Sequence, residues 1–498
     1  MKLWPFRRGG ASAALGKWDL SQPLLSWSRR DAWTIRDAVA GSMILGSTGS
    51  GKSSGSGKHL AHAFLRSGFG GLVLTAKADE RHQWERYCQA TGREDDLIAV
   101  DVDGEWVFNA LDYEVQRSGA GAGITENLVR LLDTLVRAAD QGQDSRGGRE
   151  GDSYWQHAYQ QLTRNAIDLL VLATGKVSVS ELYRAVISAP TTANQVVSEN
   201  WQRTSLCHQL LKAADKAPKT AEQRADFGMV ADYFLLEFPN LSSKTRSVIV
   251  STFTSITDVL ARGKLRRLLC EKTTITPEAV GQGKILIIDL PVKEFGPVGL
   301  IAQAIWKFSW QRAIERRAIA NDTRPVFLWI DEYQNFADPY DMQFATTCRG
   351  ARVALTLLTQ NINNLEAAFG IGEKGKAQAA SLLGNLNTKI MHANSDAATN
   401  QWAAQMIGRS RQHFANSNAS HANQDWAASA FGFAEPGQRT AGVSEHYEYE
   451  LQPNRFSELR TGGPDNGWQV DAVLFQSGKL FAETGRTWMP VTFDQRSS

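Results

Sequence analysis

Eight consecutive residues constrain what this chain can fold into more than any other feature of its sequence. From Gly46 to Ser53 they read Gly-Ser-Thr-Gly-Ser-Gly-Lys-Ser, the pattern of a loop that wraps the phosphates of a nucleotide. An apolar run at 42–45 precedes the loop, and a helical spacing of apolar residues follows Lys52, so the motif has the strand and the helix that it requires. A flexible Gly/Ser linker is the alternative, and these flanking elements argue against it.

The residue types of the loop indicate its chemistry. Glycines let successive backbone N–H groups face the phosphates at the amino end of a helix. Lys52 is expected to reach the β and γ phosphates and to act in catalysis, and the Ser53 hydroxyl is expected to bind Mg²⁺. The predicted nucleotide-binding residues are Gly46, Ser47, Thr48, Gly49, Ser50, Gly51, Lys52 and Ser53.

A second motif follows much later in the chain, where an apolar run from Val326 to Ile330 ends in Asp331 and Glu332. Carboxylates at the carboxyl end of a parallel strand lie where such sheets bind ligands. We predict that Asp331 holds the magnesium ion through water and that Glu332 polarises the attacking water, as phosphoryl transfer to water requires. Such a pair often marks only the surface end of a strand, but the phosphate loop favours the catalytic interpretation.

Two further polar residues are candidates for reading the γ-phosphate. Gln360 ends the apolar run at 353–359, where it would hydrogen-bond the attacking water or the terminal phosphate. Arg349 precedes the same run and is predicted to reach the nucleotide of a neighbouring subunit as an arginine finger. Arg352 competes for that role, and a solvated surface arginine is the plain alternative for Arg349.

Composition sets limits on the class of protein. The chain has 498 residues, 42% of them hydrophobic, which predicts two or three domains, or one large domain with an insertion. No apolar run approaches the length of a membrane span, and the first residues lack the apolar segment of a signal peptide. Four scattered cysteines indicate neither a zinc site nor a disulfide framework, which favours the cytoplasm. A net charge of +2 gives no global attraction to nucleic acid, so any DNA contact must be local.

The chain alternates short apolar runs with helical stretches, the pattern of an α/β protein with a mainly parallel sheet. We expect a RecA-like P-loop NTPase core with an inserted all-alpha domain, because about two hundred residues separate the second and third strands, too many for one crossover. The predicted strands are 42–45, 72–75, 285–289, 326–330, 353–359 and 389–392. The predicted divisions are an N-terminal segment at 1–40, the nucleotide-binding domain at 41–175 and 270–498, and the helical insertion at 176–269.

Two other regions carry weaker signals. The stretches 470–475 and 480–483 flank Gln-Ser-Gly-Lys and predict a β-hairpin at the edge of the sheet. The stretches 140–151 and 412–442 are rich in small and polar residues, so we expect them to be mobile and assign them no regular structure.

Several segments in order resemble the type IV coupling proteins, hexameric ATPases that link DNA substrates to type IV secretion channels in bacterial conjugation. Leu-Val-Leu-Thr-Ala-Lys-Ala-Asp at 72–79 is similar to the family's second strand and its Asp-Pro-Lys-Gly-Glu, with Lys77 in register. Phe-Asn-Ala-Leu at 108–111 is similar to its Phe-Asn-Pro-Leu, and Tyr154-Trp155 lead into the insertion. Arg349 followed by Gln360, and then the stretch 387–399, resemble the family's C-terminal core.

The chain also departs from the family. Thr75 and Ala76 replace the Asp-Pro pair, and Ala110 replaces the proline of Phe-Asn-Pro-Leu. Many members begin with membrane helices, which this sequence lacks. We therefore expect a cytoplasmic protein that either belongs to a soluble branch or is peripheral at the inner membrane, reaching it through a separate protein.

The resemblance implies a function, cofactors and partners. It implies a homo-hexameric ring that uses ATP and Mg²⁺ to pump DNA towards a type IV secretion channel. The implied partners are DNA, a relaxase or relaxosome or other secreted protein substrates, the channel ATPases and inner-membrane components of the channel. Two alternatives remain open at this point: another ring-shaped DNA translocase in segregation, packaging or defence, and a substrate-docking receptor whose ATPase serves only assembly.

Overall fold

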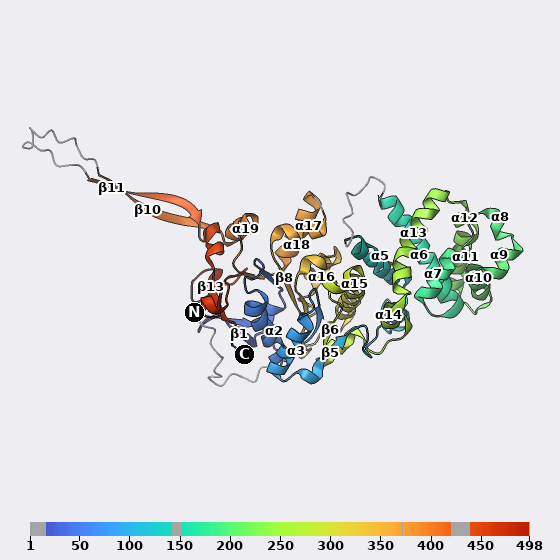
Figure 1. Cartoon of the computed structure of the whole chain (residues 1–498), viewed down its shortest axis with the longest axis horizontal. Helices are drawn as coiled ribbons and strands as arrows, with labels where there is room; N and C mark the ends of the chain where they lie inside the picture. The colour runs from blue at the N-terminus through green and yellow to red at the C-terminus, as the bar shows by residue number, and fades with distance from the viewer. Residues whose placement is uncertain (1–15, 142–151, 371, 420–438, 498) are drawn as a thin grey trace, which may run out of the picture.

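A computed structural model describes residues 16–141, 152–370, 372–419 and 439–497. Its centre is a sheet in which nine strands of the described chain lie side by side (Figure 1). In order across the sheet, the strands are β13 (Trp488–Asp494), β12 (Gln469–Gln476), β9 (Thr388–Met391), β3 (Ser42–Leu45), β8 (Val353–Thr359), β7 (Val326–Ile330), β4 (Gly70–Leu74), β6 (Ile285–Ile288) and β5 (Leu97–Val100).

Seven of these strands, from β9 to β5, run parallel, and β12 and β13 extend the sheet antiparallel at one edge. The central strands are apolar on both faces because each face is covered, as is usual for parallel sheets. This arrangement confirms the predicted α/β fold with a mainly parallel sheet.

Alternate residues of each strand contribute to two separate hydrophobic layers. On one face, Ile44, Phe327 and Leu358 pack with α2 (Lys58–Arg66) and α3 (Glu80–Thr91). On the other face, Leu328 and Leu355 pack with α5 (Thr125–Gln141), α15 (Val292–Arg316), α16 (Tyr340–Thr347), α17 (Ile362–Phe369) and α18 (Glu373–Asn385). The core is therefore a three-layer sandwich with the sheet in the middle.

The residues before the first core strand are tied to the core. A small ribbon of β1 (Pro23–Ser26) and β2 (Ala32–Thr34), followed by α1 (Ile35–Ala38), adds Trp27 and Trp33 to the layer over α2. The Lys479 ammonium forms an ion pair with Asp37 at 2.9 Å. The part of the predicted N-terminal segment that the structure describes thus packs as one unit with the C-terminal strands.

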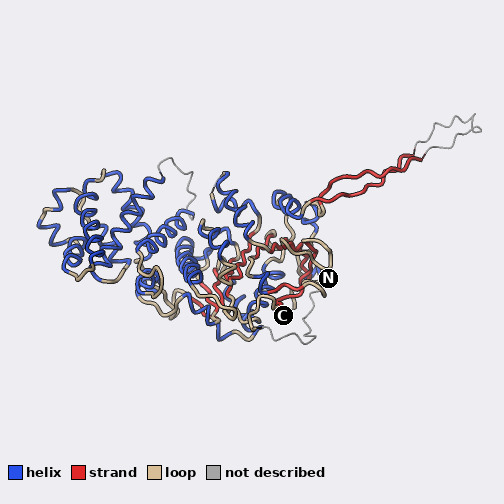
Figure 2. Tube along the Cα trace, turned by 180° about the vertical axis from the view of Figure 1, so that it is seen from behind, coloured by secondary structure: helices blue, strands red, loops and turns tan. Residues whose placement is uncertain are grey.

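A lobe of helices lies at one end of the molecule (Figure 2). Its first helix, α6, packs against α10, α11 and α13 and also touches α5 of the core. The domain limits remain a prediction. The helices of the lobe are α6 (Asp152–Thr174), α7 (Val179–Ile187), α8 (Ala193–Val196), α9 (Glu199–Thr204), α10 (Leu206–Lys216), α11 (Ala221–Asp232), α12 (Phe238–Asn240), α13 (Ser243–Leu260) and α14 (Gly263–Arg266).

The structure corrects or extends some of the local predictions. Strand β5 was not expected, because only four apolar residues follow the acidic turn at 94–96. The hairpin has the wrong second strand: β12 pairs with β13, whereas 480–483 lies in the connection, where the buried Phe481 turns the chain back through its backbone bond to Arg486.

The stretch expected to be mobile at 412–442 is partly a long antiparallel ribbon of β10 (Arg409–Ala419) and β11 (Arg439–Tyr449), which projects from the core near α19 (Ala397–Ile407) (Figure 1). The remainder of that stretch, 420–438, lies outside the described residues, as does 142–151 of the other stretch; 140–141 complete α5. Within the described ranges, no helix is both long and apolar enough to cross a bilayer.

A buried ion pair fastens α15 to the segment after β7. The Lys307 ammonium lies 2.7 Å from Asp341 and also donates to the carbonyl oxygen of Phe336, and the Tyr333 hydroxyl donates to the same carboxylate at 2.7 Å. All of these side chains are buried. Because a buried carboxylate without its cation keeps the full cost of desolvation, this pair is important for holding the 331–341 segment.

We expect Lys307→Met to lower the free energy of unfolding of the sheet core by about 3 kcal/mol, because Asp341 would stay buried and unpaired. Urea denaturation followed by tryptophan fluorescence measures this loss. The control is Lys376→Met, which breaks an exposed pair with Glu373 and should cost less than about 1 kcal/mol. Equal losses in the two variants would contradict the account.

Candidate nucleotide-binding and hydrolysis site

The register of the parallel strands brings several loops to one edge of the sheet. Leu45 at the end of β3 lies beside Thr359 at the end of β8, and Ile330 at the end of β7 lies beside Leu357 and Leu74. The segments that follow these strands are the phosphate loop, Asp331-Glu332, Gln360 and the turn after β4. Residues separated by hundreds of positions thus share the edge where parallel sheets bind ligands.

The phosphate loop has the backbone that the sequence predicts. Gly49 and Gly51 have φ of 77° and 86°, a left-handed conformation that glycine adopts without strain. The Lys52 ammonium curls over the loop and donates to the carbonyl oxygens of Gly46 and Ser47. Burial lowers the pKa of Lys52, although Asp331 and Glu332 oppose this shift, so the two carboxylates are close enough to act on the lysine.

The two predicted metal-binding residues meet directly. The Ser53 hydroxyl donates to Asp331 Oδ2 at 2.8 Å, and Asp331 Oδ1 accepts from the backbone N–H of Glu332 at 2.8 Å. Hydroxyl and carboxylate oxygens are ligands that Mg²⁺ prefers, and in nucleotide sites the ion takes most of its other ligands from phosphates and water. The pair fits a magnesium ion, although no larger group of potential metal ligands gathers in the described part of the chain.

Glu332 is held by three donors. Lys77 contacts Oε1 at 2.9 Å, while Gln334 and Gln360 donate to Oε2 at 2.7 and 3.1 Å. Burial raises the pKa of Glu332, but the bonds from Gln334 and Lys77 outweigh it and bring the pKa below its usual value. The residue also has φ of 49°, a costly conformation outside glycine that is common at functional sites. An ionised, fixed carboxylate at this edge can accept a proton from water.

Gln360 lies where the sequence predicted, immediately after β8 and in contact with Glu332. The carbonyl oxygen of Gln360 accepts from the Asn394 side chain at 2.9 Å. A bond from the Thr359 hydroxyl to Gln334 at 2.8 Å completes a chain of amides beside the carboxylate. The structure therefore brings together Lys52, Ser53, Asp331, Glu332 and Gln360, whose roles remain predictions.

The loop after β9 lines the other side of the phosphate loop, and its residues were not predicted as part of the site. Ser47 donates its backbone N–H to Ala393, and its hydroxyl contacts Asn394 and Ser395. These residues and the loop at 457–461 border an open cavity of about 460 Å³. Polar residues immediately after a predicted strand are the signal that could have indicated them.

A buried histidine supports the start of the helix after the loop. His392 Nε2 lies 2.6 Å from the Ser56 hydroxyl, and its Nδ1 lies 3.1 Å from the carbonyl oxygen of Asp471. Burial lowers the pKa of His392 to about 3, so the ring is neutral at physiological pH and acts as a fixed hydrogen-bonding partner.

Arg349 lies apart from these residues. It is exposed and precedes the amino end of β8. The phosphate loop of the same chain follows the carboxyl end of β3, so the two lie at opposite ends of the parallel strands. Arg352 is buried and donates to the carbonyl oxygens of Trp18 and Thr323, each at 3.0 Å, which gives it a structural role. Of the two arginines, Arg349 alone is exposed, and its role as an arginine finger stays a prediction.

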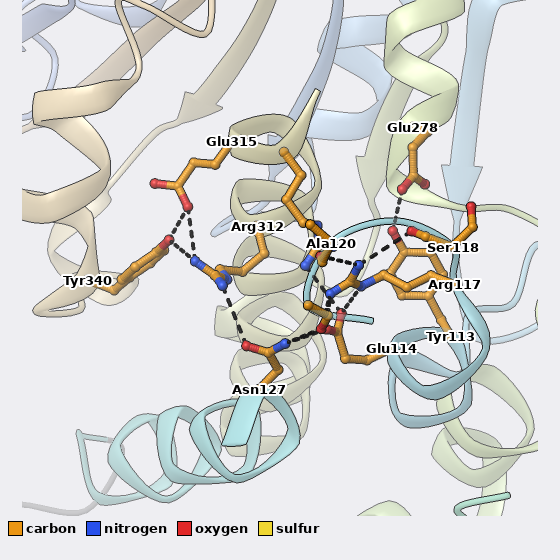
Figure 3. Close-up of polar contacts among 12 residues, drawn as sticks. Tyr113, Glu114, Arg117, Ser118, Ala120, Asn127, Glu278, Arg312, Glu315 and Tyr340 are labelled. Carbon is orange, nitrogen blue, oxygen red and sulfur yellow. Dashed lines mark hydrogen bonds and ion pairs between the residues drawn. The ribbon is translucent and has the colours of Figure 1, made fainter. Parts of the chain in front are cut away.

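Helix α16, which leads to Arg349, is anchored at both ends. At its first residue, Tyr340 contacts Arg312 of α15, and Arg312 also reaches Asn127 of α5 (Figure 3). At its last residue, the Thr347 hydroxyl donates to Glu315 of α15 at 3.1 Å. Helix α16, which ends two residues before Arg349, is therefore held by α15.

Comparisons with known proteins agree with the fold described above. Residues 325–449 match the family described as "TraM recognition site of TraD and TraG". The conjugative coupling protein TrwBdeltaN70 is similar in structure, with a TM-score of 0.57 and 16% identity over 93% of this chain and 87% of that one. No curated protein sequence matches significantly.

The same neighbour has been solved with nucleotides. TrwB in complex with the ATP analogue ADPNP has a TM-score of 0.56 and 15% identity over 93% of this chain and 88% of its own. TrwB with ADP and Mg²⁺ has a TM-score of 0.57 and 15% identity over 94% and 87%. At this level of identity, the likeness confirms the predicted RecA-like P-loop fold.

We expect Asp331→Asn to weaken the effect of Mg²⁺ on ADP binding by about tenfold, because the variant loses the anionic oxygen beside Ser53. Calorimetric titration with ADP in Mg²⁺ and in EDTA measures this effect. The control is Asp322→Asn, an exposed aspartate before β7, which should behave as wild type. A full magnesium effect in Asp331→Asn would contradict the assignment.

Proposed function

We propose that the chain is a magnesium-dependent ATPase that hydrolyses nucleotide at the carboxyl edge of its sheet. The observation that carries this proposal is the contact of Ser53 with Asp331, beside a Glu332 carboxylate that three side chains hold. Lys52 and the loop N–H groups would bind the phosphates, and Ser53 and Asp331 would hold Mg²⁺. Bound Mg²⁺ would neutralise charge that develops on the phosphates.

In the proposed reaction, Glu332 takes a proton from water as the water oxygen bonds to the γ-phosphorus. The bond from that phosphorus to the oxygen bridging the β and γ phosphates breaks, and ADP leaves with the electron pair. Gln360, which contacts the same carboxylate, would orient the water. The exposed Arg349 would stabilise the transferred group in the next subunit of a ring.

We further propose that this ATPase is a type IV coupling protein. The match of 325–449 to the TraD and TraG family and the likeness to TrwB over most of the chain support the proposal. In that role a homo-hexamer would recruit DNA in a relaxosome and pump it towards a type IV secretion channel, in contact with the channel's ATPases and inner-membrane components. Its proposed place is the cytoplasmic face of the inner membrane, held there peripherally.

We expect ATP hydrolysis per subunit to rise with protein concentration, because the proposed site needs a neighbouring subunit. It should also rise with added DNA, because the proposed motor acts on DNA. Lys52→Ala should lower kcat by at least about 100-fold, since it removes a cation that stabilises the transferred phosphate. A steady-state assay over a concentration series, with and without DNA, measures both. A rate per subunit that neither concentration nor DNA changes would favour a docking receptor over a motor.

A mixing experiment tests the trans position of Arg349. Arg349→Ala should lose about 1,000-fold in kcat, as expected for an arginine finger. Rings assembled from equal amounts of Arg349→Ala and Lys52→Ala should regain activity, because about a quarter of the interfaces combine an intact loop with an intact finger. Arg66→Ala is the control, because Arg66 is also exposed and ends α2 at the same end of the strands as Arg349. No recovery on mixing would contradict a finger supplied in trans.

A further inference from the structure

The turn after β4 presents Lys77 to the site on a rigid support. The Gln303 side chain, from α15, bonds both the N–H and the carbonyl of Thr75, at 2.7 and 2.8 Å. The carbonyl oxygen of Ala76 accepts from the N–H of Lys293, and the N–H of Ala76 donates to Glu80. The backbone of 75–77 therefore cannot move without breaking buried hydrogen bonds, each of which is costly to leave unmade.

The Lys77 ammonium contacts both carboxylates, and on Glu332 it contacts the oxygen that the amides leave free. It lies 2.9 Å from Glu332 Oε1 and 3.7 Å from Asp331 Oδ2. Gln334 and Gln360 occupy Glu332 Oε2. Each carboxylate oxygen of Glu332 thus has a donor, and Lys77 is the partner with a full positive charge.

This contact is electrostatically important because Asp331 and Glu332 are adjacent and both are only 6% exposed. Two buried negative charges repel each other and are poorly solvated, so a carboxylate that loses its cation turns away or finds another partner. The Lys52 ammonium donates to the carbonyl oxygens of Gly46 and Ser47 in the phosphate loop. It cannot replace Lys77 at Oε1 without leaving that loop.

We propose that Lys77 is a positioning residue that holds the Glu332 carboxylate in the orientation needed to accept a proton from water. This inference rests on the proposed ATPase function and adds a residue to it. Lys77 acts through Glu332 and not through the nucleotide. Its loss therefore lowers the rate of the chemical step and leaves ATP binding unchanged.

The test is a double-mutant cycle on kcat and KM for ATP, with nucleotide binding measured separately by calorimetry. Lys77→Met should reduce kcat by about 100-fold, the usual contribution of a positioned general base, with KM and the ADP affinity as in wild type. Lys77→Arg should recover part of the rate, because it restores the charge. Combining Lys77→Met with Glu332→Gln should cost no more than Glu332→Gln alone in single-turnover assays, because both changes remove one effect.

The control variant is Lys293→Met, which removes an exposed lysine whose backbone N–H bonds the same turn; its kcat should equal that of wild type. Additive losses in the double variant would overturn the inference. A weaker ADP affinity in Lys77→Met would also overturn it and would indicate a direct phosphate contact. A wild-type rate in Lys77→Met would overturn it as well. Wild-type protein that hydrolyses no ATP would instead overturn the proposed function, and this inference with it.

Discussion

The parallel register of β3, β8, β7 and β4 decides where the candidate residues around the phosphate loop lie. Because these strands end at nearly the same level, the segments that follow them meet at one edge. Buried apolar residues on both faces prevent the strands from slipping, since a shift of one residue would turn each side chain to the opposite layer. The site thus depends on the packing of two hydrophobic layers that contain none of its chemistry.

Balanced charge is the second constraint. Two lysines flank two buried carboxylates, and amides occupy the remaining carboxylate oxygen of Glu332. Burial lowers the pKa of Lys77, but Asp331 and Glu332 outweigh it, so the pKa of Lys77 ends above its ordinary value and the side chain stays charged. A nucleotide entering this site would meet groups whose positions are already fixed, which reduces the reorganisation that catalysis requires.

The sequence predicts local features well and long-range neighbours poorly. The predicted limits of β3, β7 and β8 equal those of the structure, because uninterrupted apolar runs of that length are typical of buried parallel strands. The phosphate loop and Asp331 are recognisable from contiguous residues. Lys77 and Asn394 follow different strands, β4 and β9. Their position after a strand can be predicted from the sequence, but which strands lie next to each other cannot. The wrong second strand of the hairpin has a similar cause, since the turn at Phe481 depends on contacts with the N-terminal segment.

A structure with Mg²⁺ and a non-hydrolysable ATP analogue would test the central claim most directly. The account predicts that the ion lies between the Ser53 hydroxyl and Asp331, with the terminal phosphate between Lys52 and Glu332 and with Lys77 still on Glu332. Nucleotide bound away from the loop at 46–53, or a terminal phosphate remote from Glu332, would contradict it.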